Sequence, residues 1–339
     1  MLRFVGDINL TDWDFNVGYG IGSRIVEGFD PFSHLKRSDE DCWIGNFEGV
    51  ASDTSCKDGY PSNVFRVSPK ALANLHHFDV YGFANNHAMQ HGAEAYWNTV
   101  SALESFGSKV FGTSRQRTVV IEHQGRMLSL SGVSLRVDEF TQKPEYWYNP
   151  EYSELESENS LLPNNIFNVL FIHWGNEYIN RPSSAQKKFA HWLIDAGFDL
   201  IIGMHPHVLQ GYEVYKGKRI YYSLGNFVFD MPSEACKYGA IVSVDLERDE
   251  PVFKEEYIRI DETCSPQLVE ERLVPESCRF AFLNKVLMIE DNSEQYHQEI
   301  RNEYRKYHKI SRKHILKQIC LHPRSAASLI KDFIKRRIV

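Results

Sequence analysis

The sequence predicts an α/β fold, in which two β-sheets pack together between helices and a helical extension follows at the C-terminus. Strand-like runs alternate with helix-like runs over most of the 339 residues, as in βαβ units. Strands outnumber helices and several are joined by hairpins, which suits a two-sheet sandwich better than a purely parallel sheet. Strand signals fade after residue 261, where helix formers and basic residues become frequent. We therefore expect a main domain over residues 1–261 and a basic, mostly helical extension over residues 262–339.

Short apolar runs bounded by turn residues predict the strands of the main domain. The apolar runs that end directly before polar, metal-capable residues are at residues 2–5, 42–44, 80–84, 167–172 and 199–203. Two further segments predict hairpins, at residues 118–135 and 212–224, and the last strands are expected at 240–246 and 252–260. Helical periodicity and capping residues predict helices over residues 68–77, 92–106 and 183–196. Residues 136–165 are polar and rich in proline, which indicates a long surface excursion.

Composition narrows the classes of function. With 42% hydrophobic and 24% charged residues the chain is typical of a globular protein, and its net charge of −7 gives no reason to expect nucleic acid as a partner. The six cysteines form no Cys-x-x-Cys pair, so we expect reduced thiols. No apolar segment resembles a signal peptide or a spanning helix, and we expect a cytoplasmic protein, with peripheral membrane attachment as an alternative.

Metal-capable side chains stand directly after the predicted strands. In chain order they are Asp7, Glu48, Asn86 with His87, His173, and His205 with His207. Because ligands gather at the carboxyl ends of strands in α/β folds, these residues are expected to converge on one site. Imidazole and carboxylate groups suit divalent Mn, Fe, Co, Ni or Zn, and the lack of thiolates disfavours a purely structural zinc. His205 and His207, separated by one residue of extended chain, are expected to face the same side.

Six ordered motifs over roughly residues 1–245 resemble those of the CapA family of capsule and poly-γ-glutamate synthesis proteins. They are Gly6-Asp7, Asn46-Phe47-Glu48, Ala84-Asn85-Asn86-His87, His173-Trp174-Gly175-Asn176-Glu177-Tyr178, Gly203-Met204-His205-Pro206-His207-Val208 and Tyr222-Ser223-Leu224-Gly225-Asn226-Phe227. That family is similar to calcineurin-like metallophosphoesterases. The resemblance implies a four-layer α-β-β-α sandwich and one or two divalent ions, with Mn, Fe or Zn expected.

The resemblance also implies a role for each strand-end residue. Asp7 and His207 are expected on the first metal, Asn86, His173 and His205 on the second, and Glu48 in place of a bridging aspartate. His87 is the expected catalytic residue, donating a proton to the leaving oxygen. Candidates for substrate contact or support of the ligands are Asn9, Asn46, Asn85, Glu177 and Asn226. For Glu177 and Asn226, hydrogen-bonded loop residues are an equal alternative.

Two positions depart from the pattern. Asn9 stands where the superfamily has the histidine of Asp-x-His, so the first metal is expected to be weak, absent or held partly by Asn9. Gln90 stands where CapA-like sequences usually carry an acid, and His91 follows it. Either change is expected to alter metal preference or lower activity.

Three functions remain open from the sequence. The first is a metal-dependent hydrolase that cleaves a phosphoester or related bond in an envelope polymer or its precursor. The second is a non-catalytic accessory protein of a polymer synthesis or export complex, including a membrane synthase as partner. The third is an amide-bond enzyme that acts on γ-linked glutamate.

The C-terminal extension is basic from Arg301 onward. Tyr304, Ile315, Leu316 and Ile319 fit one face of a helix. A basic amphipathic helix of this kind can lie on an anionic membrane, or pack on the main domain with its basic side in water. The second interpretation is preferred.

Overall fold

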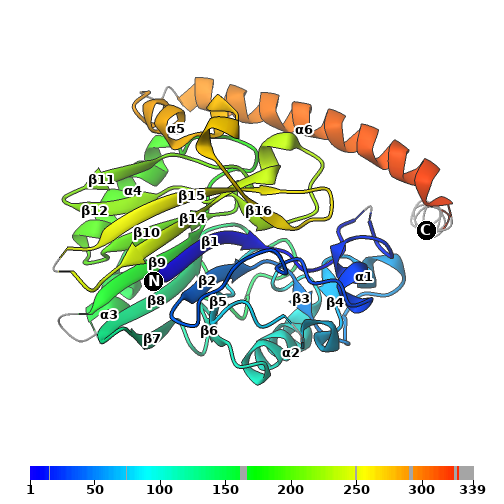
Figure 1. Cartoon of the computed structure of the whole chain (residues 1–339), viewed down its shortest axis with the longest axis horizontal. Helices are drawn as coiled ribbons and strands as arrows, with labels where there is room; N and C mark the ends of the chain where they lie inside the picture. The colour runs from blue at the N-terminus through cyan, green and yellow to red at the C-terminus, as the bar shows by residue number, and fades with distance from the viewer. Residues whose placement is uncertain are drawn as a thin grey trace.

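Two large sheets form the centre of the protein in the computed structural model, which describes residues 1–14, 16–73, 75–160, 166–248, 250–289, 293–323 and 327 (Figure 1). The first sheet contains, in spatial order, β16 (Pro266–Val269), β15 (Val252–Ile260), β14 (Tyr238–Asp245), β1 (Leu2–Ile8), β2 (Cys42–Phe47), β5 (Val80–Gly82) and β6 (Lys109–Phe111). Strand β13 (Asn226–Val228) also pairs with β1. The second sheet contains β11 (Tyr212–Tyr215), β12 (Lys218–Tyr221), β10 (Leu200–Met204), β9 (Phe167–His173), β8 (Arg126–Ser134) and β7 (Thr118–His123).

Helices and short elements connect and cover these sheets. The α-helices are α1 (Ile21–Val26), α2 (Gly92–Ser105), α3 (Tyr152–Ser160), α4 (Ser184–Asp195), α5 (Phe280–Leu287) and α6 (Ser293–Leu321). The short strands β3 (Val50–Ala51) and β4 (Arg66–Val67) pair with each other. Single 3₁₀ turns are η1 (Tyr60–Asn63), η2 (Pro69–Leu72), η3 (Glu234–Lys237), η4 (Glu271–Leu273) and η5 (Glu276–Cys278).

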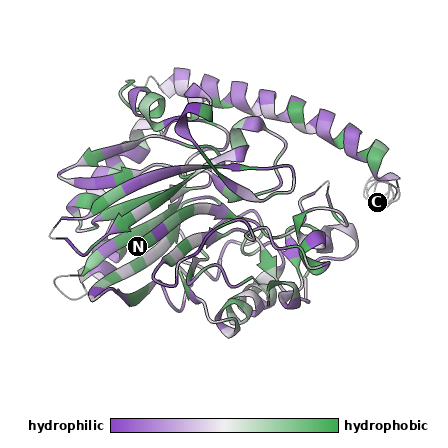
Figure 2. Cartoon of the chain, viewed as in Figure 1, coloured by the Kyte–Doolittle hydropathy of each residue, from purple (hydrophilic) through white to green (hydrophobic). Residues whose placement is uncertain are grey.

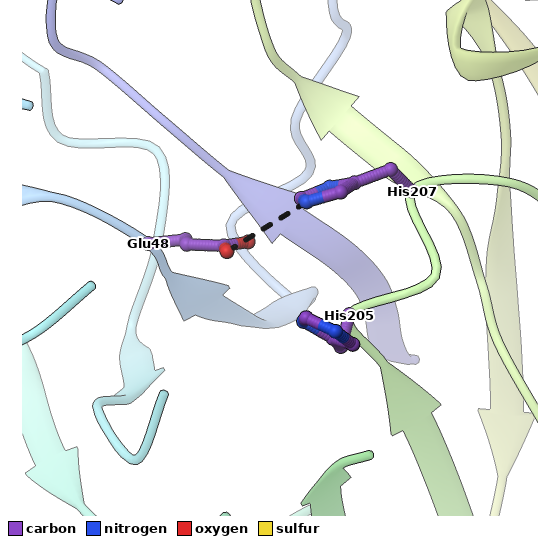
Figure 3. A group of neighbouring side chains, drawn as sticks. All are labelled: Glu48, His205 and His207. Atoms are coloured by element: carbon purple, nitrogen blue, oxygen red, sulfur yellow. Dashed lines mark ion pairs between the residues drawn. The ribbon is translucent and has the colours of Figure 1, made fainter. Parts of the chain in front are cut away.

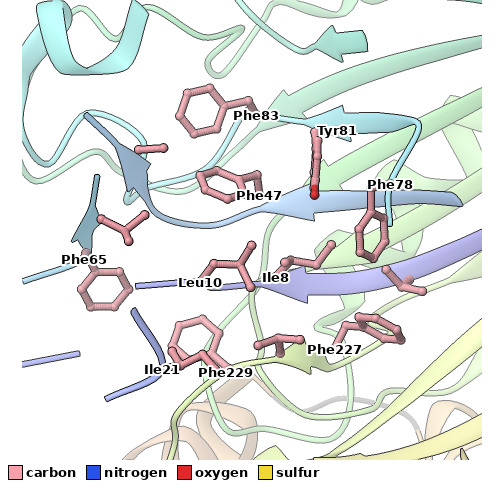
Figure 4. Packing of buried hydrophobic residues seen from close by; sticks show 14 of the residues in the cluster. Ile8, Leu10, Ile21, Phe47, Phe65, Phe78, Tyr81, Phe83, Phe227 and Phe229 are labelled. Carbon is pink, nitrogen blue, oxygen red and sulfur yellow. The ribbon is translucent and has the colours of Figure 1, made fainter. Parts of the chain in front are cut away.

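Three apolar clusters separate four layers. Between the sheets, alternate residues of facing strands interdigitate, and the rings of Phe4 on β1 and Phe171 on β9 lie 6.0 Å apart. The outer face of the first sheet packs through Phe47 and its neighbours against α2 (Figure 4). The outer face of the second sheet, including Leu170, packs against Leu193 of α4. The predicted four-layer α-β-β-α sandwich is confirmed.

Parallel pairing lines up the strand ends that matter for function. Strands β1, β2 and β5 run parallel, with Asp7 opposite Asn46 and Asn46 opposite Gly82. In the second sheet β8, β9 and β10 run parallel, with Ser134 and Met204 both opposite His173. Each set of carboxyl ends therefore forms one edge of its sheet.

Two predicted elements differ from the structure. The helix expected over residues 68–77 is reduced to η2, because Ser68 makes no side-chain capping bond. The excursion over residues 136–165 contains α3, whose Leu155 is buried against the second sheet. This helix was missed because its sequence is mostly polar. Residues 161–165 of the excursion lie outside the described residues.

The C-terminal region continues the first sheet before it becomes helical. Strand β16 pairs with β15 beyond residue 261, so the division predicted there stays a prediction. Helix α6 runs for 29 residues along the longest axis of the molecule, and most of its surface is hydrophilic (Figures 1 and 2). Its buried residues are Tyr296, Tyr307 and Ser311, whereas Leu316, predicted on the packed face, is 65% exposed. The other three residues predicted on that face, Tyr304, Ile315 and Ile319, are half-buried, so the predicted face is correct apart from Leu316.

Helix α6 nevertheless packs on the main domain, as the preferred interpretation expected. Arg301, Arg305 and Lys309 lie on its exposed side. Among the described helices, none has the length and apolar character needed to span a membrane. The last basic residues of the chain, at 335–337, lie outside the described part.

Candidate metal centre

Asp7 and Glu48 come from neighbouring parallel strands of the first sheet. Asp7 is the last residue but one of β1, and Glu48 directly follows β2, where its backbone N–H donates to the carbonyl of Ile8. Both side chains are fully buried. Asn46 Nδ2 donates to Asp7 Oδ1 at 2.8 Å, and the backbone N–H of His205 donates to Asp7 Oδ2 at 3.1 Å. These bonds fix the carboxylate of Asp7 between the two sheets.

The segment after β5 brings an amide and an imidazole to the same edge. Asn85 Nδ2 donates to the carbonyl of Phe47 at 2.8 Å, which ties this segment to the residue before Glu48. Asn85 Oδ1 accepts from the backbone N–H of His87 at 3.2 Å. Asn86 projects the other way, and its Oδ1 lies 2.8 Å from His173 Nε2. Asn85 therefore supports the turn, and Asn86 reaches the centre.

His205 and His207 reach the centre by a different route from the one expected. The expectation of an extended chain is wrong, because both residues have left-handed backbones, with φ of 96° and 58°. Such conformations are costly for residues with a Cβ, and they concentrate at functional sites. Here they turn both rings toward Glu48 from the loop after β10 (Figure 3). Gly203 permits this turn, since a Cβ there would lie 2.1 Å from the carbonyl oxygen of Tyr222.

Glu48 is the common member of the cluster. Its Oε1 lies 3.8 Å from Nε2 of His173, 3.8 Å from Nε2 of His87 and 4.0 Å from Nε2 of His207. Two groups of donor atoms fall within the span of one ion each, Glu48 with His205 and His207, and Asp7 with Glu48 and His173. A carboxylate shared by both groups is suited to bridging two cations.

The division of ligands between two ions stays a prediction. The close contacts of His173 with Asn86 and with Nδ1 of His205, at 2.8 and 3.1 Å, match the expected second-metal set. The two donor groups, however, combine His205 with His207 and Asp7 with His173. All six predicted ligands therefore meet at one centre, while their pairing is not fixed by distance alone.

The electrostatics of the centre favour a divalent cation. Burial raises the pKa of Asp7 and raises that of Glu48 well above its ordinary value, and the neighbouring Asp7 charge raises the Glu48 pKa further. Burial lowers the pKa values of His173 and His205 well below the ordinary range, so both imidazoles are neutral and have a free lone pair. Both oxygens of Glu48, Nδ1 of His173 and Nε2 of His205 are buried without a hydrogen-bond partner. A cation would satisfy all of these atoms.

His207 is oriented by a residue from a distant strand. Its Nδ1 lies 2.9 Å from Oδ1 of Asn226 on β13, which leaves Nε2 facing Glu48. Asn226 Nδ2 donates in turn to the carbonyl of Cys236 at 3.0 Å. A metal-binding histidine is commonly held by such a partner on its other nitrogen. Asn226 therefore lies between His207 and the backbone of Cys236, in agreement with the alternative of a hydrogen-bonded supporting residue.

Asn9 lies beside the centre but has its oxygen engaged elsewhere. Asn9 Oδ1 accepts from the backbone N–H and the hydroxyl of Thr11, at 2.8 and 2.7 Å. The amide nitrogen is the buried atom without a partner, and an amide N–H₂ is a donor that cannot bind a cation. In this orientation Asn9 does not replace the histidine of the superfamily motif.

His87 occupies the more open side of the centre. Its ring stacks on Phe65 at 4.1 Å, and Nδ1 lies 3.0 Å from Oε1 of Gln90. Because an amide oxygen only accepts, Gln90 fixes the proton on Nδ1 and turns Nε2 toward Glu48. Burial lowers the His87 pKa to about 4. An acid in place of Gln90 would hold the protonated ring more strongly.

Two residues near the centre, Tyr307 and Arg136, lie outside the sequence motifs and were not predicted. The ring of Tyr307 on α6 stacks on Tyr178 at 3.8 Å, and Tyr178 stacks next to His207 at 6.5 Å. Glu177 lies beside Tyr178 and raises the pKa of its hydroxyl, after burial as the main cause. Arg136, two residues past β8, is the second of these residues. Its position after the apolar run of a predicted hairpin was a strand-end signal of the same kind as the others.

Comparisons with known proteins identify the family of the chain. The family model described as "Bacterial capsule synthesis protein PGA_cap" matches residues 2–231, which include every ligand candidate. A "Capsule biosynthesis protein CapA" of Bacillus anthracis is 32% identical over 188 residues, covering 50% of this chain and 44% of that protein. A "PGA biosynthesis protein CapA" of Bacillus subtilis (strain 168) is 31% identical over 205 residues, covering 54% and 51%. The chain thus matches about half the length of these relatives.

Among solved structures, a 5'-nucleotidase precursor from Thermus thermophilus superposes with a TM-score of 0.46 at 16% identity, covering 84% of this chain and 58% of that one. The family match covers more than half of the chain and includes all the strand-end motifs. The chain belongs to the bacterial capsule synthesis protein family PGA_cap.

Proposed function

We propose that the chain is a metal-dependent hydrolase that cleaves a phosphoester or related bond during synthesis of a capsule, poly-γ-glutamate or another envelope polymer. The observation that carries the proposal is the buried Glu48 carboxylate, whose two oxygens have no hydrogen-bond partner while three imidazoles surround it. A purely structural polar cluster would satisfy these atoms internally. The link to polymer synthesis rests on the family and on the names of the relatives.

The residues fit one or two divalent ions such as Mn, Fe or Zn. Asp7, Glu48, Asn86, His173, His205 and His207 would hold them. When bound, such ions acidify a water molecule and stabilise negative charge on the scissile group. Asn46 and Asn226 keep Asp7 and His207 in place. His87 lies at the open side, where Phe65 and Gln90 hold its ring in position. Its neutral ring carries the proton on Nδ1 and its pKa is lowered to about 4, so Nε2 must first take up a proton from water before it can protonate the leaving oxygen.

Turnover of a generic aryl phosphate, with Mn²⁺ or Zn²⁺ supplied to purified protein, tests this proposal. We expect metal-dependent hydrolysis that His173→Ala abolishes and that His87→Ala lowers by roughly 10²- to 10⁴-fold, the usual contribution of a general acid. His34→Ala removes an exposed imidazole outside the site and is the matched control. Absence of turnover on phosphomonoesters and phosphodiesters with several metals would contradict the proposal.

One observation favours a second candidate, a non-catalytic accessory role. A Mycobacterium tuberculosis relative, 26% identical over 241 residues, is named "Probable polyglutamine synthesis accessory protein". Asn9 also replaces an imidazole of the superfamily motif. In this role the site binds a metal or an anionic ligand within a synthesis complex, with a membrane synthase as partner. Full polymer production by a His205→Ala His207→Ala double variant would support it, and loss of production would favour the hydrolase.

A further inference from the structure

Arg136 occupies a strand end that belongs to the same edge as the proposed ligands. It lies two residues past β8, and Ser134 at the end of β8 is opposite His173 in the parallel pairing of β8 with β9. The backbone N–H of Leu135 donates to the carbonyl of His173 at 2.9 Å. Arg136 itself is half-buried, and its Nη1 donates to the carbonyl of Gly175 at 2.7 Å. One guanidinium nitrogen is therefore anchored to the loop that follows His173.

The remaining edge of the guanidinium is free. Nε is buried without a hydrogen-bond partner, and Nη2 makes no bond to any described residue. Across the described chain, Arg136 forms no ion pair with a carboxylate. Nε and Nη2 together present the two parallel N–H donors that bind one carboxylate or phosphate group at two points. A buried donor left unpaired is costly, which indicates that a ligand completes this edge.

Arg136 lies next to the segment that carries His173, because its Nη1 is bonded to Gly175 and the preceding Leu135 is bonded to His173. Burial is the main cause of the lowered pKa values of His173 and His205, and the positive charge of Arg136 contributes to both. This charge also acts on the hydroxyl of Tyr304 on α6, in the direction opposite to Glu177. The charge of Arg136 thus acts on groups of both the His173 segment and α6.

We propose that Arg136 binds an oxyanion of the substrate, a phosphate or a carboxylate group, at the rim of the metal centre and so positions the scissile bond over Glu48 and the histidines. The inference rests on the proposed function, because it places the substrate at that centre. Arg136 is then a residue that determines specificity, because a substrate without an anionic group could not make the contact that orients it. Because the guanidinium is held by Gly175, the anion meets a donor pair already in position.

Equilibrium binding of inorganic phosphate to the metal-loaded protein tests this inference without any need for turnover. Isothermal titration is expected to give an affinity that Arg136→Gln weakens by about 10-fold or more, which corresponds to a lost charge-assisted pair. Arg136→Lys keeps the charge but not the paired donors, and is expected to be intermediate. Arg126→Gln, an exposed position at the other end of β8, is the matched control and is expected to bind like the unchanged protein.

A parallel titration with glutarate distinguishes a carboxylate ligand from a phosphate. The inference is supported if the unchanged protein binds either anion more tightly than Arg136→Gln does. The metal content and the melting midpoint of each variant are measured to check that the centre and the fold are retained. If Arg136→Gln is unstable, Arg136→Lys is compared with the unchanged protein instead. Equal affinities in Arg136→Gln and the unchanged protein, or no binding of either anion, would overturn the inference. Arg136-dependent anion binding without any hydrolysis would support the anion-binding role of Arg136 and would count only against the proposed hydrolase function.

Discussion

At the scale of single residues, Glu48 determines how the centre depends on pH. In the metal-free fold, burial and the Asp7 charge raise the pKa of Glu48, so the folded protein keeps a proton that the unfolded chain has lost. The stability contributed by that proton is complete below the ordinary pKa of glutamate. It is lost as the pH rises through the raised pKa of the folded state. A cation that pairs with the ionised carboxylate compensates the cost of burying its negative charge.

The stabilising effect of metal is therefore expected to increase with pH. The rise in melting midpoint on adding Mn²⁺ should be larger at about pH 8 than at about pH 5, because a metal ion has to displace the proton that the raised pKa keeps on Glu48, and this displacement becomes easier as the pH rises. Glu48→Gln cannot ionise and should reduce the pH dependence. Differential scanning fluorimetry across this range measures the effect. An equally steep pH dependence in Glu48→Gln would contradict it and assign the effect to other groups.

Residues also show where prediction from sequence succeeds. Asp7, Glu48, Asn86, His173, His205 and His207 were predicted to converge because strand ends share an edge. The structure brings five of them together as buried side chains, and the half-buried Asn86 contacts His173. The left-handed backbones of His205 and His207 were not predictable, since local propensity disfavours them and only the surrounding packing imposes them. Arg136 was missed because it follows a segment predicted as a hairpin, although it stands just after the end of β8.

At the scale of elements, α6 connects the C-terminal region to the rim of the centre. Tyr307 stacks on Tyr178 at 3.8 Å and contacts the ring of Trp13 at 6.3 Å. Further along, the ring of His322 stacks on Tyr19 at 3.8 Å. Near the start of the helix, Arg181 pairs with Glu299 at 2.9 Å. The helix thus bridges loops that follow strands of both sheets.

Removing the central contact should release the helix locally. Tyr307→Ala deletes a buried aromatic ring, a change that typically costs about 3–5 kcal/mol in a packed core. We expect faster amide hydrogen exchange over residues 296–321 with metal content unchanged, because no ligand lies on α6. Arg305→Ala, which shortens an exposed side chain of the same helix, should leave exchange as it was. Unchanged exchange in Tyr307→Ala would show that the ring stack does not hold the helix.

Element prediction failed where pairing is non-local or packing overrides composition. Strand β13 returns beside β1 from more than 200 residues away, and this return brings Asn226 to His207. No local pattern predicts such a partner. Helix α3 forms in a polar segment because Leu155 is buried on the second sheet. By contrast, the strands that precede the ligands were predicted well, since continuous apolar runs identify strands buried on both faces.

At the scale of the whole molecule, the two sheets each supply part of one centre. Asp7, Glu48 and Asn86 lie at or just after the ends of strands of the first sheet, and His173, His205 and His207 lie at or just after the ends of strands of the second. The inter-sheet core, with contacts such as Phe4 with Phe171, holds these two sets at a fixed separation. A centre assembled in this way depends on both sheets, so a bound ion would stabilise the entire sandwich.

Metal content is the measurement that tests this account most directly. Purified protein loaded with Mn²⁺ or Zn²⁺, dialysed and analysed by mass spectrometry for metal per chain, should retain at least one equivalent. The His205→Ala His207→Ala variant should retain much less, and His34→Ala should match the unchanged protein. Two equivalents would support a bridged pair at Glu48, and one would indicate that Asn9 leaves a single position. Metal content no higher in the unchanged protein than in the double variant would contradict a metal centre at this site.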